Sequence, residues 1–211
     1  MQINPTKILV LAPHTDDGEL GCGGTIARFS LQGAQIFYAA FSLCTKSLPA
    51  GLPPDTLERE CKSATSLLGI PSSNLFFYNY EVREFPSARQ QILEDLVQLN
   101  DKVKPDLVLL PAASDIHQDH QVIHNEGLRA FKNSSIAGYE LPWNNAHFKT
   151  DLFITLDEPS LAKKIGSLKA YASQAQRSYM KEDFIRSLAR VRGVQCNAEL
   201  AEAFAVYRMI H

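Results

Sequence analysis

Short apolar runs alternate with longer amphipathic stretches along most of the chain. Residues 8–11 and 36–41 are apolar runs with strand character, whereas residues 56–68 carry apolar side chains near the helical period and are followed by Gly69 and Pro71. A glycine with a proline shortly after it is typical of the end of a helix. Strands that alternate with helices in this way indicate βαβ units.

The same rhythm continues to the end of the chain. Further strands are expected at 74–78, 107–110, 138–141, 152–156 and 203–210, and further helices at 87–103, 121–131, 159–171 and 177–193. Ser87 is expected to cap the first of these helices. The continuous apolar run 107–110 is typical of a parallel strand that is covered on both faces. Together the elements predict one α/β domain over residues 1–211, with a Rossmann-like, doubly wound, mainly parallel sheet and helices on both faces.

Composition narrows the class of partner. The chain has 211 residues, 45% of them hydrophobic, and a formal net charge of -2, so it can bury a sizeable core without structural metal or disulfides. The mixed charges argue against a nucleic-acid groove or a polybasic membrane surface. The sequence shows neither a secretory signal pattern nor an apolar stretch of membrane-spanning length, which predicts a cytoplasmic location and no membrane insertion. A small-molecule partner is expected, and the formation of a homo-oligomer is left open.

Acidic residues and a histidine follow the first predicted strand directly. The run His14-Thr15-Asp16-Asp17-Gly18-Glu19 lies at a strand end, where ligands bind in open α/β sheets. Its acids repel one another unless a cation or hydrogen bonds offset their charge. Gly21, Gly23 and Gly24 resemble a phosphate loop, but the carboxylates would oppose a phosphate. The glycines are instead expected to let the following helix pack closely on the sheet.

A second group of ligand-type residues follows the strand predicted at 107–110. It reads His117-Gln118-Asp119-His120, with Asp115 just before it, so two loops at strand ends could converge on one point. Imidazole and carboxylate ligands without thiolate suit catalytic zinc, which takes three protein ligands and keeps one position open. Spacing alone does not choose the ligands that would join His14. The candidates are Asp16, Asp17, His117, Asp119 and His120.

Both motifs resemble those of the LmbE-like, N-acetylglucosaminylphosphatidylinositol de-N-acetylase family of zinc-dependent N-deacetylases. The family carries H-P-D-D-x-E-x-G-x-G-G-T after its first strand and H-x-D-H after a later one, and this chain matches nearly every fixed position of both. Thr15 and Gln118 stand where the family often has proline. Neither departure removes a candidate ligand.

The resemblance implies roles for individual residues. It implies one zinc ion on His14, Asp17 and His120, with Asp16 as the general base for the attacking water. It further implies that His117 stabilises the oxyanion or acts as an acid. Asp119 would orient a neighbouring histidine. The implied reaction is hydrolysis of the acetamide of an N-acetylglucosamine-type sugar or glycoconjugate, which releases acetate and a free amine.

Four more residues are candidates for the surroundings of the site. Arg59, on the helix predicted at 56–68, is placed near the site by the resemblance. Trp143 could form a platform for a sugar ring or belong to the core, and Glu140 is an acid close to it. Glu19 could support the metal ligands from behind or could simply be an acid favoured at a helix N-terminus.

Two other functions are compatible with parts of this pattern. Metallo-β-lactamase-like hydrolases also contain H-x-D-H, but within H-x-H-x-D-H, and Asp115 stands where that signature has its first histidine. A non-catalytic Rossmann-like module could use the same acidic loop to hold a cation or a sugar hydroxyl. Catalysis itself distinguishes this second alternative from an enzyme.

Overall fold

All seven strands of the computed structural model, which describes residues 3–210, form one sheet in the order β3-β2-β1-β4-β5-β7-β6. The strands are β1 (Lys7–His14), β2 (Gln35–Ser42), β3 (Leu75–Phe77), β4 (Leu107–Pro111), β5 (Ser135–Tyr139), β6 (Leu152–Leu156) and β7 (Leu200–Arg208). The α-helices are α1 (Asp17–Leu31), α2 (Thr56–Leu67), α3 (Arg89–Val103), α4 (Gln118–Ala130), α5 (Glu158–Lys169) and α6 (Glu182–Gln195).

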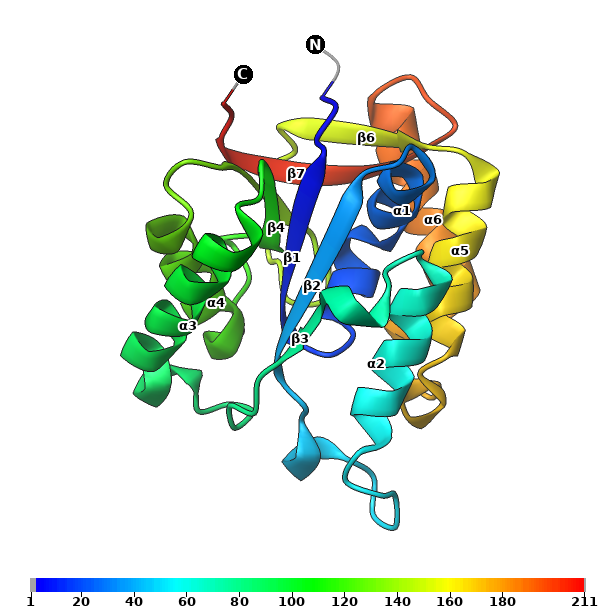
Figure 1. Ribbon diagram of the computed structural model, residues 1–211. Helices are drawn as coiled ribbons and strands as arrows, with labels where there is room; N and C mark the ends of the chain where they lie inside the picture. Colours follow the sequence, from blue (N-terminus) through cyan, green and yellow to red (C-terminus); the bar gives the residue numbers. More distant parts are fainter. Residues whose placement is uncertain (1–2, 211) are drawn as a thin grey trace.

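Helices cover both faces of this sheet. Strands β1 to β5 pair in parallel, and β7 is antiparallel to both β5 and β6. Helices α3 and α4 lie on one side of the sheet, and α1, α2, α5 and α6 lie on the other (Figure 1). Each side has its own cluster of buried apolar side chains. The predicted α/β fold with a mainly parallel, doubly wound sheet is therefore confirmed.

Several element boundaries differ from the prediction, and both α4 and β7 begin three residues earlier than expected, at Gln118 and Leu200. Strand β5 begins at Ser135, because it pairs with β4 along the whole of that strand. Ser87 does not cap α3, since it lies in a 3-10 turn and its hydroxyl donates to the Glu84 carbonyl at 2.7 Å. Helix α6 begins only at Glu182, after another short 3-10 turn. Within residues 3–210, none of the helices has both the length and the apolar character that crossing a bilayer requires.

The two chemistry-bearing motifs meet because β1 and β4 are neighbours in the sheet. These strands run parallel in register, so their carboxyl ends share one edge, toward the bottom of Figure 1. Helix α1 begins at Asp17, directly after β1, and α4 begins at Gln118 with His117 as its N-cap. Both motifs therefore lie at the start of a helix, where backbone N–H groups favour negative charge.

Helix α1 packs close to its neighbours through glycine. A Cβ atom at Gly21 would come within 2.2 Å of the Tyr139 ring, and one at Gly24 within 2.5 Å of Leu156. The helix also departs from helical backbone angles at Cys22. These glycines serve close packing, as predicted.

Candidate active site

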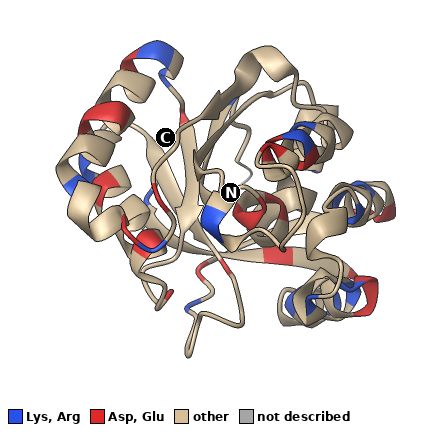
Figure 2. Ribbon diagram, turned by 90° about the horizontal axis from the view of Figure 1, so that it is seen from below, with Lys and Arg blue, Asp and Glu red and all other residues tan. Residues whose placement is uncertain are grey.

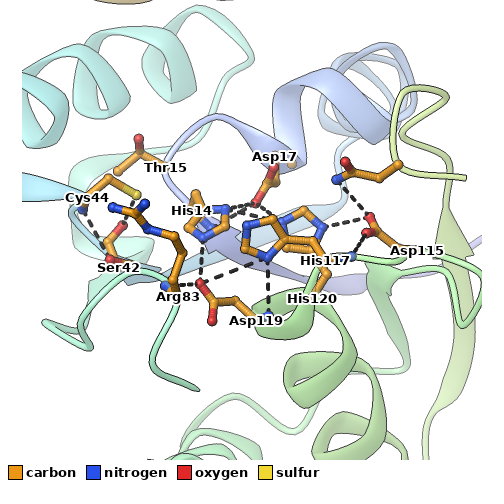
Figure 3. Close-up of polar contacts among 12 residues, drawn as sticks. His14, Thr15, Asp17, Ser42, Cys44, Arg83, Asp115, His117, Asp119 and His120 are labelled. Carbon is orange, nitrogen blue, oxygen red and sulfur yellow. Dashed lines mark hydrogen bonds and ion pairs between the residues drawn. The ribbon is translucent and has the colours of Figure 1, made fainter. Parts of the chain in front are cut away.

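Three ligand-type atoms from the two motifs form a small triangle. His14 Nδ1 lies 3.1 Å from Asp17 Oδ2 and 3.1 Å from His120 Nε2, and the last two atoms are 3.2 Å apart. Ligands of a tetrahedral zinc ion at its usual bond lengths are separated by about 3.3 Å. The spacing and the chemistry of these donors therefore fit a zinc ion. Figure 3 shows the three side chains pointing toward one another.

The second nitrogen of each histidine faces a buried carboxylate. His14 Nε2 lies 3.1 Å from Asp119 Oδ2, and His120 Nδ1 lies 2.6 Å from Asp115 Oδ2. If each imidazole donates its N–H to this carboxylate, its other nitrogen presents a lone pair to the triangle. Carboxylate partners of this kind fix the tautomer and the ring orientation of metal-binding histidines.

The carboxylates make this cluster favourable for positive charge. Burial alone would lower the pKa of His14 and of His120, but neighbouring carboxylates outweigh it and raise both, that of His120 to about 10. Burial alone would raise the pKa of Asp17, but the charges of His120 and His14 lower it. Either protons on the imidazole nitrogens or a metal ion can supply this positive charge at the same atoms.

His117 offers a second set of nitrogen ligands. Ligand atoms of His14, His117 and His120 all lie within 4.8 Å of one another, so this trio could also bind a metal. However, His117 Nδ1 accepts the backbone N–H of Asp119 at 3.2 Å, which leaves Nε2 to carry the proton of the neutral ring. Burial, followed by the positive charges of His120 and His14, lowers the pKa of His117.

A cavity of about 350 Å³ opens over the triangle. Its wall includes His14, Asp16, Asp17, His117, His120 and Trp143. Burial, and then the charge of Asp17, raises the pKa of Asp16 to about 6. A carboxylate with a raised pKa beside a ligand triangle is suited to accept a proton.

The loop that carries Asp16 is held by two tyrosines. The carbonyl of Thr15 accepts hydrogen bonds from the hydroxyl groups of Tyr38 at 3.0 Å and Tyr171 at 2.6 Å. Both hydroxyl groups also contact the carboxyl group of Glu19. Burial raises the pKa of Glu19 to about 8, although the hydrogen bonds with the tyrosines oppose this shift. Glu19 thus lies beneath the site, and the tyrosines hold the loop at Thr15.

The remaining expected residues are divided between the cavity and other places. Trp143 is 37% exposed and stacks on Tyr179 with ring centroids 4.1 Å apart, so it is not a core residue. Arg59 is exposed and pairs with Asp55 one helical turn away, and it is not part of the cavity wall. Its neighbour Glu60 instead accepts hydrogen bonds from Ser173.

Glu140 also lies outside the cavity. Its carboxylate forms two contacts with the guanidinium of Arg192 on α6, one of them at 3.0 Å. The expected places of Arg59 and Glu140 are therefore corrected: helix α2 turns Arg59 outward, and the end of β5 turns Glu140 toward α6. His124, on the same helix as His120, donates from Nδ1 to the Pro111 carbonyl oxygen at 2.8 Å and packs edge-on against Tyr207.

Sequence reasoning missed several residues around the cavity, three of which are charged. Asp115, 2% exposed, holds His120 and also accepts the backbone N–H of His117 at 2.8 Å. Its place before the H-x-D-H motif, at the carboxyl end of β4, was a usable signal. Arg83 and Arg177 line the cavity from irregular segments, where periodicity offers no guide.

Charges of both signs are spread over the outer helices. Figure 2 shows acidic and basic residues on the same helices on both sides of the sheet. This distribution agrees with the net charge of -2. It fits a small-molecule site better than a long basic groove for nucleic acid.

The chain is similar in sequence to known deacetylases. The family model of GlcNAc-PI de-N-acetylase (PIG-L) matches residues 9–131, which include both motifs. The uncharacterized deacetylase YaiS of Escherichia coli strain K12 is 29% identical over 170 residues, covering 79% of this chain and 90% of the relative. A probable N-acetyl-alpha-D-glucosaminyl L-malate deacetylase 2 of Bacillus anthracis is 25% identical over 195 residues, covering 81% of this chain and 82% of the relative.

Solved structures share the fold at lower identity. N,N'-diacetylchitobiose deacetylase from Pyrococcus horikoshii superposes with a TM-score of 0.79 at 22% identity, over 96% of this chain and 84% of that one. The 4-carboxy-2-hydroxymuconate hydratase GalB from Pseudomonas putida reaches the same TM-score at 18% identity, over 98% of each chain. The fold alone thus does not determine the reaction.

The sequence matches decide between the alternatives. Neither the metallo-β-lactamase-like reading nor a non-catalytic module agrees with a family match that spans both motifs and more than half of the chain. The resemblance seen in the sequence is confirmed. The chain belongs to the GlcNAc-PI de-N-acetylase (PIG-L) family, as an enzyme that hydrolyses an amide bond.

Proposed function

We propose that this protein is a zinc-dependent deacetylase that hydrolyses the acetamide of an N-acetylglucosamine-type sugar or glycoconjugate. The observation that carries the proposal is the triangle of His14 Nδ1, Asp17 Oδ2 and His120 Nε2, with edges of 3.1 to 3.2 Å. When bound there, zinc would polarise the amide carbonyl and make water a better nucleophile. The β5–β7 region completes the sheet beside the matched segment, which supports one catalytic domain over residues 1–211.

Asp16 is the general base in this proposal. It lines the cavity next to Asp17 but contributes no atom to the triangle. Its carboxylate accepts a proton from water as the water attacks the amide carbon, and then delivers a proton to the departing nitrogen. The tyrosine bonds to the Thr15 carbonyl support this role, because they hold the backbone immediately before Asp16.

His117 stabilises the negative charge that develops on the amide oxygen. Its Nδ1 is occupied by the backbone N–H of Asp119, so the neutral ring carries its proton on Nε2. The side chain lines the cavity. Because the pKa of His117 is lowered, the donor in this proposal is a neutral imidazole N–H rather than an imidazolium.

A sugar-type substrate is supported by the aromatic residues of the cavity wall and by the names of relatives. Trp143 and Tyr179 form a stacked aromatic pair at the cavity, and such rings pack well against the apolar face of a sugar. The B. anthracis relative is named for an N-acetylglucosaminyl substrate, and the P. horikoshii structure for diacetylchitobiose.

The decisive experiment measures metal content and acetate release in the same preparations. We expect about one zinc per chain after mild purification, and acetate release from at least one member of a panel of N-acetylated sugars. Asp16→Asn should keep the zinc and lower turnover by about 10² to 10⁴-fold. Asp101→Asn, which changes an exposed acid on α3, is the matched control and should leave both values unchanged.

Two results would contradict the proposal. Elemental analysis that finds no zinc, nickel or iron in the purified protein would exclude the metal site. If Asp16→Asn loses the metal whereas Asp17→Asn keeps it, the roles of base and ligand are exchanged between these neighbours.

A further inference from the structure

Two arginines at the cavity differ from the others in the described part of the chain. Of the ten arginines, six pair with a carboxylate: Arg59, Arg89, Arg129, Arg186, Arg190 and Arg192. Arg28 and Arg208 donate to backbone carbonyls. Arg83 and Arg177 line the cavity, and within residues 3–210 neither forms an ion pair with a carboxylate. Their charge is therefore available to a ligand.

The backbone of Arg83 is held in place by Asp119, which also contacts His14. Its backbone adopts a positive φ of 72°, and its N–H donates to Asp119 Oδ2 at 2.5 Å. The same Asp119 oxygen lies 3.1 Å from His14 Nε2. Figure 3 shows the Arg83 side chain leaving this backbone in the direction of Cys44, which also lines the cavity. The backbone of Arg83 is thus fixed relative to the triangle through Asp119.

Arg177 belongs to the segment between α5 and α6. Its Nε donates to Gln174 Oε1 at 2.7 Å, and its guanidinium carbon lies 5.8 Å from the centre of the Tyr179 ring. Gln174 is itself buried in the cavity wall. Arg177 is therefore positioned beside the aromatic pair of Tyr179 and Trp143.

The acids of the cavity wall leave the two guanidinium groups unpaired. Among the described residues these acids are Asp16 and Asp17, and Asp17 pairs with His14 and His120. Neither acid forms an ion pair with Arg83 or Arg177. Arginine presents paired N–H groups that match the oxygens of a carboxylate or a phosphate.

We infer that Arg83 and Arg177 form an anion-binding subsite, so that the preferred substrate is an acetamido sugar carrying a carboxylate or phosphate group. This inference rests on the proposed function, since the sugar must place its acetamide over the triangle. The cavity of about 350 Å³ lies at the small end of ligand pockets. It therefore suits one sugar ring with a small anionic substituent.

Trp143 makes binding measurable without catalysis. It is the only tryptophan of the chain and lines the cavity, so its fluorescence reports on occupancy. The zinc-loaded protein is titrated with glucosamine, glucosamine 1-phosphate, glucosamine 6-phosphate and muramic acid, which lack the acetyl group and are not turned over. We expect at least one anionic sugar to bind ten or more times as tightly as glucosamine. The two phosphates and the carboxylate distinguish the source of the anion.

The arginine variants test whether these side chains are responsible. Arg83→Gln and Arg177→Gln should each weaken the anionic sugar at least tenfold and leave glucosamine within about twofold, because only the charge contact is removed. Arg190→Gln, which changes an arginine paired with Glu199 on the surface, is the matched control and should change neither value. Circular dichroism and melting curves establish that each variant is folded.

The outcomes separate this inference from the proposed function. If no anionic sugar binds more tightly than glucosamine, or if the variants weaken glucosamine and the anionic sugar equally, the subsite is refuted even where acetate release is seen. If the anionic preference depends on both arginines but no acetylated sugar releases acetate, the subsite stands and the proposed function fails.

Discussion

Helix α1 contacts two buried clusters of charge that are built in different ways. At its start, Asp17 contacts His14 and His120, whose second ring nitrogens face Asp119 and Asp115. We call these five residues the ligand cluster. The second cluster surrounds its kink: Lys164 Nζ lies 2.6 Å from Glu202 Oε1 and 2.7 Å from the Leu20 carbonyl oxygen. Glu202 also accepts the backbone N–H groups of Gly24 and Thr25 at 3.0 and 2.7 Å.

The difference between the clusters lies in the group that carries the positive charge. In the Lys164–Glu202 cluster it is a lysine ammonium, and the hydrogen-bonding atoms face one another, so no set of lone pairs is left for a ligand. In the ligand cluster the imidazole nitrogens can take either a proton or a metal ion. The Lys164–Glu202 pair uses its hydrogen-bonding groups within the protein and therefore stabilises the fold. The ligand cluster can exchange protons for a metal ion and can therefore take part in catalysis.

Removal of the metal should give the largest effect and should act on only one cluster. After treatment with a chelator, we expect acetate release to fall below detection, because the triangle would then lack the zinc ion that we propose activates the amide. The helical circular-dichroism signal should persist, since the apolar cores on both sides of the sheet do not depend on the site. Zinc should restore activity. A metal-free protein that no longer unfolds cooperatively would show that the ligand cluster also holds the fold.

Replacement of the buried lysine should have the opposite signature. Lys164→Met leaves Glu202 buried without its counter-charge, and such a change costs about 3–5 kcal/mol, or a fall in melting temperature of about 6–20 °C for a chain of this size. Zinc content and turnover per folded molecule should be retained. Lys169→Met, on the same helix and paired with Glu182 at the surface, should hardly change the melting temperature. An equally stable Lys164→Met protein would refute the structural role of the pair.

Replacement of His117 tests whether this residue is an oxyanion donor or a metal ligand. We expect His117→Ala to lower turnover by about 10² to 10³-fold, as the loss of an oxyanion donor does, with zinc content unchanged. His147→Ala, in an exposed loop outside the cavity, is the control. Loss of zinc from His117→Ala would instead assign the trio of His14, His117 and His120 as the ligands.

The two clusters also differ in how far the sequence predicts them. The order of strands and helices follows from hydrophobic periodicity, and the two motifs converge because parallel strands end at one edge. Lys164 and Glu202 are 38 residues apart, and a lysine in an amphipathic helix would ordinarily be expected at the surface. Their pairing depends on how α5 and β7 pack around α1, which no local pattern encodes.

Side-chain direction limited the prediction of the site in the same way. Arg59 was placed at the site by the resemblance but points outward, because the buried stripe of Leu57 and Cys61 lies on another face of the helix. Asp115 was passed over because its bond to His120 depends on the turn between β4 and α4. The close spacing of His14 and Asp17 could be foreseen, since the strand end and the first helical turn follow each other directly.

Replacement of Asp115 should give the smallest effect, and this effect should be confined to the ligand cluster. Asp115→Asn keeps an oxygen that can accept the N–H of His120 but removes the negative charge behind the ring, so zinc affinity should fall by about tenfold, at the lower end of the range for such partners. Competition with a chelating dye measures this change, and Asp101→Asn is the control. The melting temperature of the metal-free protein should move far less than in Lys164→Met, because no charge is left stranded without a partner. An unchanged zinc affinity would mean that Asp115 only accepts the backbone N–H of His117. The carboxylates that favour zinc binding would then be Asp17 and Asp119 alone.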